Sequence, residues 1–178
     1  MVWGFSNDVF WFNSSYKKMN RIIIVTPLIV LLIICIFSLI YLLSGKDPNK
    51  PPSALLNKDV PSFKSISLYS SKEIIKTKEL KNKKTLINFF ASWCSPCKIE
   101  HPLFFEIRKK YPELYLLGFN HKDSALDAKK YLENDGNPYD FVGVDSDGLI
   151  ALEFGVFGLP ETYLINEDGK IIYKFMGP

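Results

Sequence analysis

Cysteine and histidine are scarce in this sequence. Its 178 residues include three cysteines and two histidines. Three cysteines are too few for a small secreted fold held together by several disulfides. A structural zinc site needs four ligands, and Cys94 and Cys97 reach that number only with His101 and His121, which lie on unrelated predicted elements. Zinc binding is therefore the weaker explanation of the cysteine pair.

The sequence also has no large excess of charge of either sign. The formal net charge is +3, and the basic residues are scattered among the acidic ones along the chain. A nucleic-acid-binding domain gathers its basic side chains on one stripe or face, so the sequence argues against that function. The length allows one ordinary domain and an accessory segment.

One long apolar run lies near the N-terminus. Residues 22–43 are almost wholly Ile, Leu, Val, Phe and Cys, and a helix of that length spans roughly 33 Å, the thickness of the hydrocarbon layer of a bilayer. A core helix is rarely apolar on every face, and a signal peptide has a shorter apolar region. The sequence predicts a single transmembrane anchor over residues 22–43, after an N-terminal extension over residues 1–21. The positive-inside rule favours a cytoplasmic N-terminus and an exported domain.

A proline-rich spacer, residues 44–58, is predicted to join this anchor to a catalytic domain over residues 59–178. In that domain, residues 85–91 are typical of a strand buried on both faces, and residues 114–119 form a second apolar run. Residues 97–110 between them are predicted to be helical. The unit implied is strand, helix and parallel strand.

The remaining elements are shorter. A half-buried strand is expected in residues 63–68, a helix over 123–133 with Asp123 or Ser124 as N-cap, and a strand over 141–144. After a short helical stretch that ends near Phe154, residues 161–165 and 170–175 are predicted to form a hairpin.

The chemistry centres on the motif Cys94-Ser95-Pro96-Cys97, at the junction of the buried strand and the first helix of the domain. Two cysteines at this spacing can close and open a small disulfide ring. The helix N-terminus stabilises a thiolate on Cys94, which we expect to be the nucleophile. Cys97, predicted to be the less exposed of the two, would resolve the mixed disulfide with a client. The alternative without chemistry is that both cysteines are inert core residues.

Residues 88–98, with Trp93 before the first cysteine and Pro102 after the second, resemble the signature of the thioredoxin superfamily. Residues 155–162 resemble the loop of that superfamily that carries a cis-proline. The resemblance implies an α/β fold, with a mixed central sheet flanked by helices. It also implies that Pro160 follows a cis peptide bond, lies against the disulfide and helps to bind the extended backbone of a client.

Within the superfamily, the chain is most similar to the DsbE or CcmG type, the membrane-anchored periplasmic proteins of cytochrome c biogenesis. The similarity rests on Glu100 and His101 after the second cysteine, residues 118–123, residues 136–139 and residues 155–162. It implies a reductant in the bacterial inner membrane with its catalytic domain in the periplasm. Its clients would be the haem-attachment cysteines of apocytochrome c or a partner thiol protein, and a transmembrane thiol carrier would return electrons to it. The cysteine pair would need no metal or other cofactor.

Four polar residues near the motifs carry further expectations. Asn88 stands where cytosolic thioredoxins carry a buried aspartate, so that carboxylate is missing as proton acceptor for Cys97. Glu100 or Glu161 could replace it and tune the redox properties by raising thiol pKa values. The alternative is that both glutamates are solvated surface acids. His101 is expected on the helix surface.

Two other functions stay open at this stage. One is a general dithiol oxidoreductase of the same compartment, and the other is a metal or haem chaperone that uses the cysteine pair as ligands. The chain also departs from the family pattern, because the sequence ends at Gly177-Pro178, where the family continues into a C-terminal helix. Either the sequence is a fragment, or one face of the sheet is left partly open as an exposed apolar area.

Overall fold

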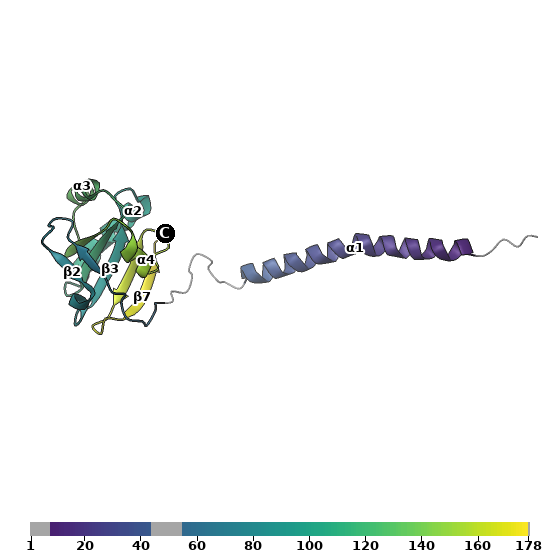
Figure 1. The fold of residues 1–178 in the computed structure, drawn as a ribbon, viewed down its shortest axis with the longest axis horizontal. Helices are drawn as coiled ribbons and strands as arrows, with labels where there is room; N and C mark the ends of the chain where they lie inside the picture. Colours follow the sequence, from purple (N-terminus) through teal and green to yellow (C-terminus); the bar gives the residue numbers. More distant parts are fainter. Residues whose placement is uncertain (1–7, 44–54, 178) are drawn as a thin grey trace, which may run out of the picture. The chain divides into compact units, whose positions relative to one another are not determined.

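The computed structural model describes residues 8–43 and 55–177 (Figure 1). The chain divides into two compact units, Met1–Pro51 and Pro52–Pro178. Most of the predicted spacer, and the first part of the predicted N-terminal extension, lie outside the described residues.

The first unit contains one long helix, α1 (Asp8–Leu43). It begins well before the predicted anchor because residues 8–21 contain neither glycine nor proline to interrupt it. Within it, Val25–Leu43 is long and apolar enough to cross a membrane, and none of this stretch is buried. Pro27 lies inside the helix.

The second unit is built on a five-stranded mixed sheet in the order β5-β4-β3-β6-β7. The central strand β3 (Thr85–Phe90) runs parallel to β4 (Tyr115–His121), which runs parallel to β5 (Phe141–Asp145). On its other side β3 pairs antiparallel with β6 (Glu161–Ile165), and β6 pairs antiparallel with β7 (Ile171–Met176). The predicted strand-helix-parallel strand unit and the predicted hairpin are both confirmed.

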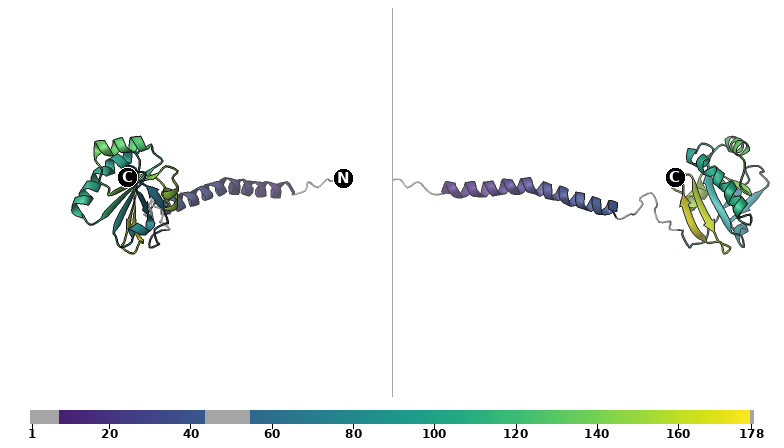
Figure 2. Two further views of the ribbon diagram at one scale, coloured as in Figure 1. Left: turned by 60° about the vertical axis from the view of Figure 1, so that its left-hand side comes forward. Right: turned by 180° about the vertical axis from the view of Figure 1, so that it is seen from behind.

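Helices cover both faces of this sheet. α2 (Ser95–Lys110) and α3 (Ala125–Asp135) lie on one side of the sheet, and α4 (Leu149–Glu153) lies on the other (Figure 2). The buried apolar residues of α2 and α3 belong to one core cluster, and those of α4 belong to the other. Successive residues of β3 point to opposite faces. Phe89 therefore packs with the α4 cluster, and Phe90 packs with the cluster that contains both cysteines of the motif. This two-sided burial explains why the strand is a continuous apolar run.

A small hairpin completes the domain. β1 (Lys64–Ile66) lies within the predicted strand 63–68, but its partner β2 (Ile74–Lys76) and the 3-10 helix η1 (Thr77–Leu80) were not predicted. Each is only one turn or three residues long and is rich in lysine, so neither forms a periodic apolar pattern. Ile75 and Leu80 nevertheless reach the core on the α4 side.

The face of the sheet that carries α2 is partly open at β7. Tyr173 and Phe175 pair with Leu164 and Thr162, and side chains of directly paired residues share a face. Both aromatic side chains are exposed, 58% for Tyr173 and 43% for Phe175. An apolar area thus lies on this face, next to the strand that follows Pro160.

Candidate active site

Cys94 and Cys97 are joined by a disulfide at the carboxyl end of β3, where α2 begins. Cys94 is the N-cap of α2, and its Sγ accepts a hydrogen bond from the backbone N–H of Cys97 at 3.2 Å. Pro96 lies in the first turn of the helix, where a missing N–H costs nothing. The Cys97 N–H points toward the sulfur at the N-terminus of the helix, which is the arrangement that stabilises a thiolate.

The two cysteines do not differ in exposure. Cys94 is 3% exposed and Cys97 is 4% exposed. The prediction that Cys97 is the less exposed of the two is wrong for this oxidised form, because the ring places both sulfur atoms in the same apolar cluster. Their expected roles must therefore rest on position, since Cys94 caps the helix and Cys97 lies one turn inside it.

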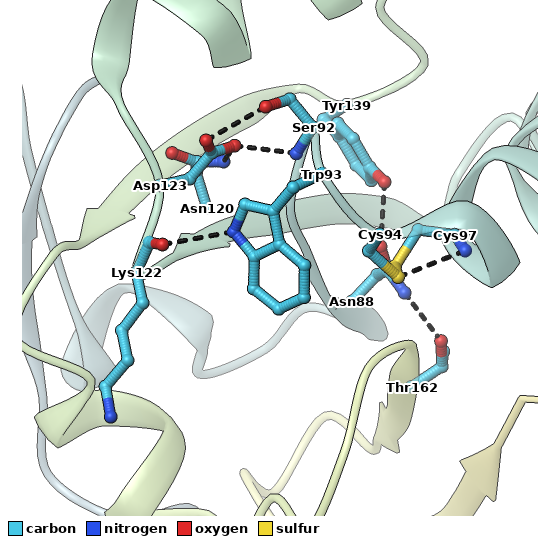
Figure 3. Close-up of a disulfide and its surroundings, with 10 residues drawn as sticks. All are labelled: Asn88, Ser92, Trp93, Cys94, Cys97, Asn120, Lys122, Asp123, Tyr139 and Thr162. Carbon is cyan, nitrogen blue, oxygen red and sulfur yellow. Dashed lines mark hydrogen bonds between the residues drawn. A yellow bond between two sulfur atoms is a disulfide. The ribbon is translucent and has the colours of Figure 1, made fainter.

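A buried polar chain runs beneath the disulfide (Figure 3). Asn88 lies in the middle of it, accepts a hydrogen bond from the hydroxyl of Tyr139 at 2.8 Å and donates one to Thr162 Oγ1 at 3.0 Å. Burial raises the pKa of Tyr139 well above its ordinary value, with smaller contributions from Tyr131 and Glu100. Tyr139 is therefore a neutral donor, and its bond fixes which way the Asn88 amide faces. The sequence singled out Asn88, whereas Tyr139 and Thr162 belonged only to the motifs that carry the resemblance and had no predicted role.

The residues before Cys94 are held by the loop between β4 and α3 (Figure 3). The Asp123 carboxylate accepts hydrogen bonds from Ser92 N at 2.6 Å and Ser92 Oγ at 2.9 Å. It also accepts bonds from the side-chain amide of Asn120 at 2.9 Å and from Ser124 N at 2.8 Å. The Trp93 indole N–H donates to the Lys122 carbonyl at 3.1 Å. Asp123 was expected as a possible helix cap and as part of the motif over residues 118–123, but neither indicated its bonds to Ser92. Ser124 is the residue that caps α3.

Trp93 itself is 60% exposed beside the disulfide. Its indole lies over the β4–α3 loop with one edge hydrogen-bonded and its ring open to solvent (Figure 3). An aromatic ring held in this way offers apolar contact area next to the cysteines without a further loss of side-chain freedom.

Glu100 lies on the same face of α2 as Cys97, three residues further along. It is 7% exposed, and its Oε2 has no hydrogen-bond partner within the part of the chain that the structure describes. Burial raises its pKa above the ordinary value. The alternative that Glu100 is a solvated surface acid is wrong, because α2 turns this side chain into the core beside Tyr139.

Glu161 is buried as well, but in a different environment. It is 2% exposed, its Oε1 accepts from the Phe157 N–H at 2.9 Å, and its Oε2 lies 2.9 Å from Lys174 Nζ. The hydroxyl of Tyr163 lies 2.8 Å from the same Oε2. The surface alternative is therefore wrong for this residue too, because a lysine and an amide replace the water that would otherwise solvate its charge.

His101 is not a surface residue, contrary to expectation. It is 4% exposed, its Nε2 lies 2.9 Å from the Gly136 carbonyl, and its ring contacts Phe105 and Tyr131. The buried face of α2 consists of Cys97, Glu100, His101 and Phe104, whereas Ile99 is 72% exposed. Glu100 and His101 point inward because they share the face of α2 that carries Cys97.

The Leu159–Pro160 peptide bond is cis, as the resemblance implied. The neighbouring Leu159 is partly buried and packs against both core clusters, one of which contains the two cysteines. The Pro160 carbonyl accepts a hydrogen bond from Gly177 N at 3.0 Å. A Cβ on Gly177 would lie 2.5 Å from Pro160 Cγ, so only glycine fits at this crossing.

The described residues contain no group of three or more His, Cys, Asp or Glu side chains that could hold a metal ion. What the geometry offers is a disulfide at a helix N-terminus, with a buried carboxyl on the same helix face. Such an arrangement can exchange a disulfide with another protein.

Comparison with known proteins identifies the family. A model described as Redoxin matches residues 55–178. The thiol:disulfide interchange protein CycY of Rhizobium leguminosarum is 38% identical over 75% of this chain and 72% of its own length. The thiol:disulfide interchange protein DsbE of Pseudomonas aeruginosa is 37% identical over 89% of this chain and 86% of its own length.

The chain belongs to the DsbE/CcmG family of thiol:disulfide interchange proteins. Among solved structures, a DsbE protein from Chlorobium tepidum superposes with a TM-score of 0.61 at 25% identity, over 68% of this chain and 85% of that chain. The fold is thioredoxin-like, and the chain is a thiol:disulfide oxidoreductase with its disulfide at Cys94 and Cys97.

Proposed function

We propose that this protein is a membrane-anchored periplasmic reductant of cytochrome c maturation. The observation that carries the proposal is the disulfide at the N-cap of α2, in a chain whose relatives are DsbE-type interchange proteins. The clients are the haem-attachment cysteines of apocytochrome c or a partner thiol protein of the same assembly. A transmembrane thiol protein supplies the electrons.

The reaction starts from the reduced dithiol. The Cys94 thiolate attacks one sulfur of the client disulfide, so the client S–S bond breaks, a mixed disulfide forms and one client thiolate leaves. Cys97 then loses its proton and attacks Cys94 Sγ, which releases the second client thiolate. Two electrons pass to the client, whose thiolates take up protons, and the product is the Cys94–Cys97 disulfide seen in the structure.

Glu100 is proposed to tune this step. Asn88 cannot take a proton, and Glu100 is the buried carboxyl one helical turn beyond Cys97. Because its pKa is raised by burial, it can exchange a proton nearer to neutral pH than an exposed glutamate does. The resolving thiol of Cys97 is the group that must lose a proton in the reductive reaction. The cysteine pair acts without a metal or other cofactor.

Pro160 and Trp93 are proposed to contact the client on the two sides of the cysteines. The cis-proline loop presents extended backbone to the client chain, and the exposed Trp93 ring gives apolar contact on the other side of the cysteines. α1 is proposed to be the inner-membrane anchor with its N-terminus in the cytoplasm, because Val25–Leu43 has the length and composition of a span.

The reduction potential of the full-length protein, equilibrated with glutathione in detergent, tests this function. Thioredoxin lies near about −270 mV and the oxidant DsbA near about −120 mV. A value below about −200 mV is expected for an electron donor. A value at the DsbA end would make the protein a disulfide-forming oxidant and refute the reductive role, and failure to form the disulfide would favour the chaperone alternative.

A further inference from the structure

Lys174 of β7 is a partly buried lysine that the proposed chemistry does not use. Its side chain is 8% exposed. Its Nζ lies 2.9 Å from Glu161 Oε2, donates to the Gly155 carbonyl at 2.9 Å and sits 5.3 Å from the centroid of the Tyr163 ring. Lysine side chains are almost never this buried unless they are paired. The surrounding groups therefore form a specific environment for the Lys174 ammonium group.

Sheet register explains how these groups meet. Lys174 pairs directly with Tyr163 across β6 and β7, and Glu161 lies two residues before Tyr163 on the same strand. All three side chains therefore share one face. Tyr163 belongs to the α4 cluster, whereas the two cysteines of the motif belong to the opposite cluster. The ion pair thus lies on the other side of the sheet from the disulfide.

The contacts of this group converge on the loop between α4 and β6, residues 154–160, which ends in the cis-proline. Lys174 binds the Gly155 carbonyl, Glu161 binds the Phe157 N–H, and the Tyr163 hydroxyl lies 2.9 Å from the Phe154 carbonyl. At the other end of the loop, Gly177 binds the Pro160 carbonyl. Lys174 of β7 and Gly177, the residue that follows this strand, therefore hold the loop at its two ends.

We propose that Lys174 is a positioning residue for loop 154–160, acting together with Glu161. The proposal rests on the function given above, in which this loop binds client backbone. Lys174 neutralises Glu161, so the carboxylate fixes the Phe157 amide instead of acting on the dithiol. The pair sets how well a client is bound and leaves the redox properties of Cys94 and Cys97 unaltered.

The test compares variants of the full-length protein in detergent. Lys174→Met removes the charge and both hydrogen bonds, and Lys174→Arg keeps the charge and the donors. Lys170→Met is the matched control, since Lys170 lies in the same hairpin but pairs at 3.4 Å with Asp59 on the surface. Removing one member of a buried ion pair leaves the other charge unpaired and can unfold a protein. The double variant Lys174→Met with Glu161→Gln avoids that charge and still lacks the donor to Gly155.

The client probe is a synthetic peptide with an oxidised Cys-x-x-Cys-His site, the haem-attachment motif of c-type cytochromes. Single-turnover rates against peptide concentration give a half-saturating concentration and a limiting rate. Loss of one good hydrogen-bonded contact, about 1.4 kcal/mol, corresponds to about a tenfold change. Lys174→Met and the double variant are expected to raise the half-saturating concentration by about that factor, with limiting rate and reduction potential unchanged. Lys174→Arg restores most of the affinity, and Lys170→Met matches wild type.

An altered reduction potential with unchanged peptide affinity would overturn the proposal and assign redox tuning to the pair. Unchanged values of both would also overturn it. If wild type does not reduce the peptide at all, the proposed function fails, and the positioning role is then read from hydrogen exchange at the Phe157 amide. Faster exchange there in Lys174→Met than in Lys170→Met supports positioning, and equal exchange refutes it.

Discussion

Asp123→Asn is the substitution that examines most directly how the active-site loop is held. The carboxylate of Asp123 receives only donors: Ser92 N and Asn120 Nδ2 at Oδ2, and Ser92 Oγ and Ser124 N at Oδ1. An asparagine has the same shape but replaces one oxygen by an NH₂ group. If the NH₂ group replaces Oδ2, Ser92 N and Asn120 Nδ2 lose their acceptor. If it replaces Oδ1, Ser124 N loses its acceptor, whereas the Ser92 hydroxyl can turn and accept from the NH₂ group.

The magnitude follows from the less costly orientation, in which one charge-assisted contact is lost. A hydrogen bond to a charged group contributes about 1.5 to 3 kcal/mol, so the free energy of unfolding should fall by about that amount. For a domain of this size, the melting temperature should fall by roughly 6 to 12 °C.

Thermal unfolding of the full-length protein, followed by near-UV circular dichroism, measures this loss. Asp127→Asn is the matched control, because Asp127 lies in the first turn of the same helix α3 and its side chain is exposed. The control should lose no more than about 1 kcal/mol, the usual contribution of an acid at a helix N-terminus. Equal melting temperatures for the two variants would refute the claim that Asp123 holds the loop.

Three further predictions concern the dithiol and the polar groups around it. Cys97→Ala should accumulate a mixed disulfide between Cys94 and an oxidised client, because the resolving thiol is missing. This adduct is visible on a non-reducing gel. No such adduct should form with Cys94→Ala, and an adduct there would reverse the assigned roles. Tyr139→Phe should destabilise the domain by about 1 to 3 kcal/mol in a denaturant titration, since the Asn88 carbonyl loses its buried donor; an unchanged midpoint would mean that water replaces the hydroxyl. Glu100→Gln should be more stable than wild type at neutral pH, and the advantage should shrink as pH falls toward 4.5, whereas the exposed Glu106→Gln on the same helix should show no such pH dependence.

The sign of the Glu100 prediction follows from its raised pKa. Burial raises that pKa above 4.5, so the folded protein holds the proton more tightly than the unfolded chain does. The stabilising contribution is complete below the unfolded pKa and is lost as pH rises through the folded value. Glutamine keeps the neutral form at every pH. A wild-type protein whose stability relative to Glu100→Gln does not fall as pH rises would show that Glu100 is solvated in solution.

The strands and helices were largely predictable because their signals are local. The continuous apolar run of β3, the Ser124 cap of α3 and the turn between β6 and β7 each follow from a few neighbouring residues. The cysteine pair was also found from spacing alone. β2 was missed because a three-residue strand with one buried side chain makes no pattern that stands out from a loop.

Contacts between distant segments were not predictable. Tyr139 meets Asn88 across 51 residues, and Asp123 meets Ser92 across 31. Nothing near either residue in sequence indicates the partner, since tyrosine and aspartate are ordinary in loops. The error on His101 has a related cause, because the apolar residues Ile99 and Leu103 lie on the exposed side of α2 and the polar residues Glu100 and His101 on its buried side. The buried face is instead fixed by Cys97, whose place is set by the disulfide.

Glu100 and Glu161 lie on opposite sides of the sheet, and this position gives them different roles that the sequence alone could not distinguish. Both follow conspicuous motif residues, Glu100 after Cys97 and Glu161 after Pro160, and both are buried. Glu100 lies on the α2 side, and its Oε2 has no partner among the described residues, so its proton is available to neighbouring groups. Glu161 lies on the α4 side, where Lys174 compensates its charge and the Phe157 amide occupies its other oxygen. A carboxylate already neutralised by a cation has little electrostatic effect on thiols across the sheet. We therefore expect substitutions at Glu100 to move the pH dependence of the reaction, and substitutions at Glu161 to move client affinity.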